Sequence, residues 1–591
     1  MIWLEHMAAW HLLLWLVPGV SALLLAAIGG RLALPWIWLL SVVGVGWTTL
    51  QSALVGWFYL QGTPLPDRYP IALPWAAVPD LSGWSFAIDG TRAWAVFLAS
   101  VLCLAAQTVA LQWVVHRAGR HRFHALVLGV AASAAFLFTS RLDLRVLPIG
   151  FLVGWEGIAL TTGALTGFWA EEQRGMRPGV RWILFQRLSG VLLLTGLLVW
   201  RRDPQSGAYL LLLAAGVRAG LLMLHGWVPS TMDGPLPVPL LVQGAASILS
   251  SVFLIEASWD ALGQAGVSPD AVSLVGLLGA LLGTLAGLQP QAPQKAVGWL
   301  FIAHSGLVFL AYGQGDPVAA RWIVTGAVLT LSGLLLVVKW AADEQGAESG
   351  QGTMGGGLGK KWFYFGLAAL LLPPSMEFLG LGRLLGGTRM DSRGTIVRLV
   401  VIAAAWAMGW IIRRLMHDLS DEKPSGSGPL RRMVRLVPVV LWSLSFILGA
   451  SSLFFHGDEV IGGRSGAIWA GTCSLAGVLG WILSSLFHRG RRRRMFGRLT
   501  FAQRVMEYLA DTGLGIGEVL VQIPLVVAQA LGVLIWRVLG DFLIDTLIIG
   551  TTVRTIEGVG MTLRFLQNGY AQRYLLVVVL GTLCLMLLML R

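Results

Sequence analysis

The sequence is poor in charged residues for a chain of its length. Asp, Glu, Lys and Arg together make up 12% of 591 residues, whereas soluble globular proteins contain roughly 25%. Hydrophobic residues make up 56%, and one soluble core cannot bury that much apolar surface. We therefore expect the lipid bilayer to surround most of the chain.

Cysteine is also scarce, and no cluster of cysteine and histidine is present. The three cysteines, Cys103, Cys473 and Cys584, each lie inside an apolar run, and no CxxC pair occurs. This pattern excludes the usual zinc, haem and iron–sulfur signatures. No glycine-rich nucleotide loop is apparent either. We expect no metal, no cofactor and no redox centre in this chain.

The formal charge of +13 does not indicate a nucleic-acid partner, because the basic residues lie between apolar runs. They indicate orientation in a membrane instead. The N-terminus has Glu5 and no basic segment before its first apolar run. It therefore predicts a first span and not a cleaved signal.

Apolar runs of about 20 residues can cross a bilayer, and about sixteen are present. They lie near residues 8–29, 36–60, 92–115, 123–140, 146–169, 180–200, 207–224, 236–256, 271–289, 296–314, 320–340, 361–386, 397–416, 434–455, 466–487 and 572–590. Loops that follow odd-numbered spans are richer in Lys and Arg. The positive-inside rule then places these loops in the cytoplasm and both termini on the external, periplasmic side of the inner membrane. The predicted fold class is all-α, polytopic.

Residues 500–566 differ from the other apolar segments because ten charged residues interrupt them, Glu507 and Asp545 among them. This spacing favours a long helix along partner proteins or the membrane surface. An additional pair of spans is the alternative, since residues 519–536 are apolar enough to cross.

Prolines interrupt two apolar segments that lie five segments apart. Pro229 interrupts the seventh, and Pro373 with Pro374 interrupts the twelfth. Broken helices in matching positions are typical of transporter repeats with a path near the membrane midplane. Helix packing is the other reason for a proline in such a place.

Glu156 lies deep within the apolar segment 151–169. A carboxylate inside a membrane is costly and is by default a functional hypothesis. Burial favours the protonated form, which suits a carrier of protons. A carboxylate that is paired only for packing is the structural alternative.

Several motifs resemble the large antiporter-like, proton-translocating subunit of respiratory complex I, the chain L type. The stretches that carry the resemblance are FLVGWEGIALTTGALTGFW (151–169), VRAGLLMLHGWVPSTMDGPLPVP (217–239), QPQAPQKAVGWLFIAHSGLVFLAYG (289–313), MGGGLGKKW (354–362) and LQNGYAQRY (566–574). The resemblance implies two inverted five-helix repeats with broken helices, a long C-terminal lateral helix and a path of buried charged residues. It also implies membrane subunits as partners, reached partly through residues 500–566.

The sequence departs from that family at the residues which would carry protons. The family's lysine on the seventh span aligns with Arg218, and arginine stays charged under nearly all conditions. Its histidine on the eighth span aligns with Gln243. Arg218 is either a fixed partner of Glu156 or part of a gated path.

In the second repeat the family's central lysine aligns with Gln294 or Lys295, and His304 follows in the same span. Glu377 comes after the prolines of the twelfth segment, displaced from the family's usual position. Lys295 is a central proton carrier or only a charge at the end of a span. His304 is a proton carrier or a packing residue. Lys339, on the eleventh span, is out of register with the family lysine and is expected to extend to the membrane surface.

These observations predict five regions: three spans in 1–115, a first repeat in 116–260, a second in 261–417, two spans and a basic loop in 418–499, and the lateral helix with a last span in 500–591. Three functions remain open. The chain is a proton-translocating subunit of a complex I-like NADH:quinone oxidoreductase, a non-pumping structural subunit, or the membrane subunit of a cation/proton antiporter or inorganic-carbon uptake complex.

Overall fold

The computed structural model describes two compact units, residues 1–518 and 519–591. The described residues are 11–60, 69–70, 85–114, 119–168, 177–221, 224–289, 292–346, 366, 372–388, 391–418, 429–456, 463–488, 526, 530, 550–566 and 576–584.

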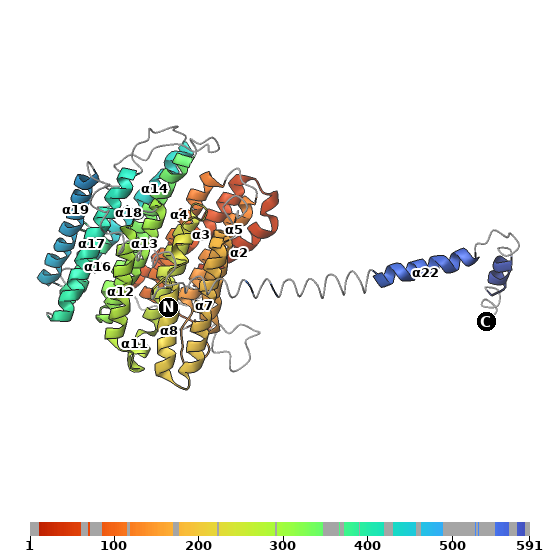
Figure 1. Cartoon of the computed structure of the whole chain (residues 1–591), viewed down its shortest axis with the longest axis horizontal. Helices are drawn as coiled ribbons and strands as arrows, with labels where there is room; N and C mark the ends of the chain where they lie inside the picture. Colours follow the sequence, from red (N-terminus) through yellow and green to blue (C-terminus); the bar gives the residue numbers. More distant parts are fainter. Residues whose placement is uncertain are drawn as a thin grey trace. The chain divides into compact units, whose positions relative to one another are not determined.

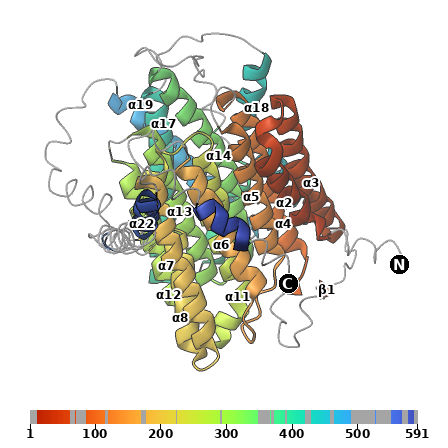
Figure 2. The same cartoon turned by 90° about the vertical axis from the view of Figure 1, so that its right-hand side faces the viewer.

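The first unit is built almost entirely from helices that run side by side (Figures 1 and 2). Its elements are α2 (Leu13–Ile28), η1 (Gly29–Arg31), α3 (Leu34–Leu60), β1 (Tyr69–Pro70), β2 (Ser85–Phe86), α4 (Gly90–Trp113), α5 (Arg120–Thr139), α6 (Ile149–Thr166), α7 (Arg177–Trp200), α8 (Pro204–Arg218), α9 (Val228–Thr231), α10 (Val238–Leu240), the π-helix η3 (Leu241–Leu249), α11 (Ser250–Gln264), α12 (Pro269–Gly287), α13 (Pro293–Gly313), α14 (Pro317–Gly346), α16 (Met376–Gly387), α17 (Ser392–Asp418), α18 (Pro429–His456) and α19 (Gly463–His488). The two short strands pair antiparallel, with Tyr69 opposite Phe86.

The predicted all-α, polytopic membrane fold is confirmed. Among the described residues, 13 helices are long and apolar enough to cross a membrane. Of the other predicted spans, 207–224 corresponds to α8, which has 15 residues, and 361–386 is described only at residue 366 and from residue 372, where α16 has 12 residues. The last predicted span is described only over residues 576–584. A helix satisfies its own backbone hydrogen bonds, which is what a segment surrounded by hydrocarbon requires.

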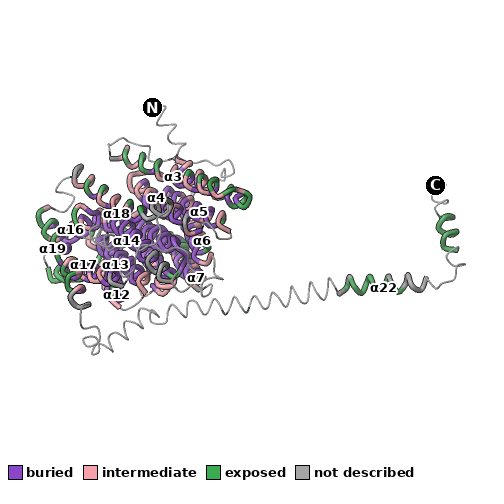
Figure 3. The backbone as a smooth tube through the Cα atoms, turned by 90° about the horizontal axis from the view of Figure 1, so that it is seen from above, coloured by how far each residue is buried: buried purple, intermediate pink, exposed green. Residues whose placement is uncertain are grey.

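Burial in the first unit decreases from the central helices to those at the edge. Helices α13 and α14 are buried along most of their described length, and the helices at the edge expose apolar side chains (Figure 3). Leu23 of α2 is 71% exposed and Ile468 of α19 is 68% exposed. Apolar surface on this scale would be unfavourable in water, so these faces fit contact with lipid.

Both predicted interruptions lie next to the terminus of a described helix. The first follows the end of α8, and the second precedes the start of α16. Helix α8 begins after the N-cap Asp203, where hydrogen bonds from Ser206 and from the Gln205 N–H lower the pKa of the carboxyl. It ends at Arg218, and Gly220 follows with a φ of 72°. The short helix α9, which contains Pro229, comes next, and the chain becomes helical again at α10 and η3.

The second interruption directly precedes α16. Pro373 and Pro374 come before Ser375, whose side chain accepts a hydrogen bond from the Phe378 N–H and caps the helix. Proline lacks an N–H group, so a helix cannot continue through this pair in regular form. The cap lets a new helix begin inside the bundle.

The second unit contains α22 (Gly550–Leu566) and a helical stretch over residues 576–584. Most of the predicted lateral segment 500–566 lies outside the described residues.

Candidate ion-path site

A histidine and a glutamate meet in the buried interior of the first unit. His304 lies in α13 and Glu377 in the first turn of α16. The His304 Nε2 atom is 3.1 Å from Glu377 Oε1, and both side chains have no exposed surface. The other ring nitrogen, Nδ1, is 2.7 Å from the Leu300 carbonyl oxygen. The sequence named both residues as candidates, and the fold brings them into direct contact.

The surroundings of Glu377 leave little room for movement. A Cβ atom on Gly326 of α14 would lie 2.6 Å from Glu377 Oε2 and 2.8 Å from its backbone nitrogen. Only glycine allows α14 and α16 to approach this closely. Glu377 also lies at the N-terminal end of α16, where the helix dipole favours negative charge. The break at Pro373 and Pro374 is therefore what places a carboxylate inside the bundle.

A second set of charged residues lies around Glu156 of α6. Its direct ion-pair partner is Arg187 of α7. Gly190, one turn along α7 from Arg187, leaves the space that the Glu156 carboxylate occupies, because a Cβ atom there would clash with Oε1. The Glu156 side chain is 30% exposed and that of Arg187 is 39% exposed within the isolated chain. This pair therefore lies nearer to the surface of the unit than His304 and Glu377 do.

Arg218 lies beside this pair but is held mainly by the main chain. Its Nε donates to the Ala246 carbonyl oxygen at 2.8 Å, and one terminal nitrogen donates to the Trp155 carbonyl oxygen at 3.0 Å. The guanidinium also stacks 3.7 Å above the Trp155 ring, an arrangement that favours arginine over lysine. Trp155 directly precedes Glu156, so Arg218 reaches the turn of α6 that carries the carboxylate.

The direct partner of Glu156 is thus Arg187, which our sequence argument did not single out. Its signal is visible in retrospect, because Arg187 is an arginine inside the apolar run 180–200. Family alignment drew attention to Arg218 instead.

Lys295 occupies a different setting from His304. It lies in the first turn of α13 and forms an ion pair of 3.6 Å with Asp233, and both side chains are partly exposed. Nine residues separate it from His304, which is about 13 Å along a helix. The structure therefore brings Lys295 to the first helix interruption and not to the histidine.

The expectation for Lys339 was wrong. This side chain is only 7% exposed and turns into the bundle. Its Nζ donates to the Met232 carbonyl oxygen at 2.8 Å and to the Gly234 carbonyl oxygen at 2.5 Å. Main-chain carbonyls left without helix partners after α9 attract the ammonium more strongly than the membrane surface does.

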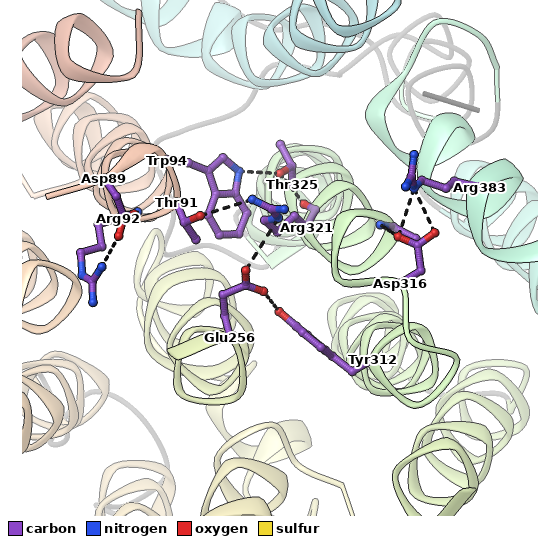
Figure 4. Close-up of polar contacts among 11 residues, drawn as sticks. Asp89, Thr91, Arg92, Trp94, Glu256, Tyr312, Asp316, Arg321, Thr325 and Arg383 are labelled. Carbon is purple, nitrogen blue, oxygen red and sulfur yellow. Dashed lines mark hydrogen bonds and ion pairs between the residues drawn. The ribbon is translucent and has the colours of Figure 1, made fainter. Parts of the chain in front are cut away.

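A polar cluster lies at the other end of α14 (Figure 4). Glu256 of α11 lies between Tyr312 of α13, which donates a hydrogen bond to it, and Arg321 of α14, at 3.9 Å. Arg321 also donates to the Thr91 hydroxyl of α4 at 3.3 Å. Close by, Arg383 of α16 pairs with Asp316 at 2.9 Å. We name these six residues the α14 cluster.

No metal site accompanies these groups: within the described part of the chain, no three His, Cys, Asp or Glu side chains gather closely enough to hold an ion.

The NADH:quinone oxidoreductase/Mrp antiporter transmembrane family matches residues 205–404. The chain contains an antiporter-like transmembrane domain of this family. That domain includes both helix interruptions, Arg218, Lys295, His304, Lys339 and Glu377, and Glu156 precedes it. The resemblance predicted from the sequence is confirmed.

Curated relatives of the chain carry related names. NADH-quinone oxidoreductase subunit L of Pseudomonas aeruginosa is 25% identical over 331 residues, which is 51% of this chain and 52% of the relative. NADH-quinone oxidoreductase subunit 14 of Thermus thermophilus is 27% identical over 386 residues, 62% of this chain and 86% of the relative. The chain thus aligns with about half the length of the first of these relatives.

Two solved structures share the fold. The Mrp complex from Dietzia sp. has a TM-score of 0.62 at 17% identity and covers 97% of this chain and 62% of its own. Respiratory complex I from Thermus thermophilus has a TM-score of 0.55 at 20% identity and covers 74% of this chain and 97% of its own.

Proposed function

We propose that the chain is the proton-translocating, antiporter-like membrane subunit of a complex I-like NADH:quinone oxidoreductase. In this role it couples electron transfer in partner subunits to proton movement through its own helices. The observation that carries the proposal is the buried contact between His304 and Glu377 at the second helix interruption.

The chemistry of this contact suits proton transfer. Imidazole and carboxylate are the side chains that most readily give and take a proton near neutral pH. An ion pair without any exposed surface is a poor source of stability, since desolvation offsets much of the attraction. A functional role explains its presence better than packing does, because intramembrane charges usually mark ion pathways.

Glu156 forms the other half of the proposed path. Its carboxylate lies inside the span of α6, and Arg187 and Arg218 provide fixed positive charge beside it. We assign Lys295 to the part of the path between Glu156 and His304. There its ion pair with Asp233 adjoins the first helix interruption. Pro229, Pro373 and Pro374 mark the interruptions that define the path.

The proposal includes the arrangement of the chain in the cell. We place it in the inner membrane with both termini on the external side, and with repeats over residues 116–260 and 261–417. Other membrane subunits are the proposed partners, in part through residues 500–566. The P. aeruginosa and T. thermophilus relatives, which are named as oxidoreductase subunits, support this assignment.

Substitution of Glu377 by Gln tests the proposal, because the amide keeps the size of the side chain and removes its ability to ionise. We expect inverted vesicles with the whole complex to move fewer protons per electron, with electron transfer and assembly retained. Asp270→Asn is the control, since Asp270 forms an exposed ion pair with Arg393 in which both side chains are over 70% exposed. An unchanged ratio of protons to electrons in Glu377→Gln contradicts the proposal.

A non-pumping structural subunit is the second candidate function. The setting of Arg218 favours it, because a permanent cation bound to two carbonyl oxygens acts as a fixed support for α6 and η3. Glu156→Gln distinguishes the two functions. Unchanged proton movement with lower assembly of the complex supports the structural role.

The fold shared with the Mrp complex keeps a cation/proton antiporter open as a third candidate. Proton movement that follows an imposed sodium gradient without any electron donor supports that function.

A further inference from the structure

We infer that Lys339 is a positioning residue which couples the two helix interruptions through α14. This inference rests on the proposed function and extends it to a residue outside the predicted path. The juxtaposition that carries it is a buried lysine of the second repeat bound to main-chain carbonyls in the interruption of the first repeat.

The contacts are specific to the interruption. Met232 and Gly234 lie in the turn between α9 and α10, where carbonyl groups no longer have helical partners. Lys339 Nζ donates to both carbonyl oxygens, at 2.8 and 2.5 Å. Hydrogen bonds to a charged donor are stronger than neutral ones. The ammonium therefore holds the geometry of this turn.

The turn is fixed from a second direction by α13. Asp233, between the two carbonyls that Lys339 binds, pairs with Lys295 at 3.6 Å. That pair is partly exposed and contributes little, whereas the contacts of Lys339 are buried. Of the two lysines that reach the turn, Lys339 is thus the stronger constraint.

The position of the turn determines the next polar contact on the proposed path. Thr231 directly precedes Met232, and its hydroxyl accepts a hydrogen bond of 3.1 Å from Gln243 Nε2. Gln243 lies in the π-helix η3. The Ala246 carbonyl oxygen of the same helix accepts a hydrogen bond from Arg218 Nε. π-Helical turns are frequent at functional sites. A displaced turn would therefore alter the hydrogen bonds of Gln243 and, through η3, the position of Arg218.

The same helix contacts the second interruption. Gly326, thirteen residues before Lys339 in α14, packs against Glu377, and thirteen residues span about 20 Å of helix. Helix α14 thus contacts Glu377 at Gly326 and contacts the turn between α9 and α10 at Lys339. A shift of α14 that accommodates a change at Glu377 would move Lys339 and the carbonyls it binds.

The test compares Lys339→Met, which keeps the length and removes the donors, with Lys339→Arg, which keeps charge and donors. Arg393→Met is the matched control, because it removes an exposed cation of the same repeat. Amide hydrogen exchange of the intact complex is measured over residues 231–243, and proton movement is measured in vesicles.

We expect Lys339→Met to accelerate exchange at residues 231–243 by at least about tenfold, since local opening reports the lost hydrogen bonds. Proton movement should fall in the same variant, and Lys339→Arg should retain both properties. If Lys339→Met does not assemble, Lys339→Gln, which keeps one donor group, takes its place and should give an intermediate rate.

Three outcomes overturn the inference. Exchange in Lys339→Met is unchanged, it is accelerated equally throughout the first unit, or Lys339→Arg accelerates it to the same extent. If the unsubstituted complex moves no protons, the proposed function fails. The exchange measurement then still decides whether Lys339 holds the turn.

Discussion

His304 Nε2 lies 3.1 Å from Glu377 Oε1, and neither side chain has any exposed surface. Because both side chains are fully buried within the chain, bulk solvent stabilises neither of them. Each residue therefore determines the protonation state that its partner can adopt. Stability and proton transfer should depend on the two residues as a unit.

A double-mutant cycle measures that dependence. His304→Gln removes the imidazole and leaves Glu377 without its partner, and breaking a buried pair typically costs about 3–5 kcal/mol. The double variant His304→Gln with Glu377→Gln contains two neutral amides. Its loss of stability should therefore be smaller than the sum of the losses in the two single variants. Thermal unfolding of the purified complex checks this outcome. Additive effects of the two substitutions would contradict a direct contact.

Gly326→Ala tests the close approach of α14 and α16 at Glu377. The added methyl group would lie 2.6 Å from Glu377 Oε2, so one of the helices or the carboxylate must move. Overpacking of this kind typically costs about 1–3 kcal/mol, and we expect lower thermal stability and slower proton movement. Gly471→Ala in α19 is the control, because no atom lies within 4 Å of the added Cβ atom. Equal behaviour of the two variants would exclude the contact as a constraint.

The fold class could be predicted from the sequence because hydrophobic length alone determines what can cross a bilayer. The interruptions were predictable for a similar reason, since proline at positions 229, 373 and 374 removes main-chain donors inside apolar segments. Both features depend on local sequence and need no knowledge of tertiary contacts.

The partners of charged residues could not be predicted in the same way. Glu156 contacts Arg187 because Gly190 opens a space on α7, which is a property of helix packing. Lys339 appeared out of register with the family and therefore peripheral. Its target is a pair of main-chain carbonyls, and a side-chain alignment cannot detect a main-chain partner.

The two arginines near Glu156 should respond differently to substitution. Arg187→Gln removes the direct ion pair, so we expect it to reduce proton movement, while Arg218 still holds the turn of α6 and stability falls less than in Arg218→Lys. Arg218→Lys keeps the charge but loses the paired hydrogen bonds and the stacking on Trp155. It should lower stability by roughly 1–3 kcal/mol. Thermal unfolding and proton movement of both variants check this division. A stronger loss of stability in Arg187→Gln would reverse the assignment.

Tyr312→Phe tests whether the α14 cluster holds the ends of α11, α13 and α14 together. The substitution removes the hydroxyl that donates to Glu256 and leaves the rest of the ring in place. Glu256 then retains Arg321 at 3.9 Å, a separation too long for a hydrogen bond. Loss of a donor to a partly buried charge typically costs about 1–3 kcal/mol. We expect a fall in thermal stability of this order, whereas Tyr209→Phe, at a side chain that is 42% exposed, should have no measurable effect. Double substitution with Glu256→Gln should cost less than the sum of the two single effects, because each change weakens the same Tyr312–Glu256 contact. Fully additive losses in that double variant would show that Tyr312 contributes to stability by packing and not through Glu256.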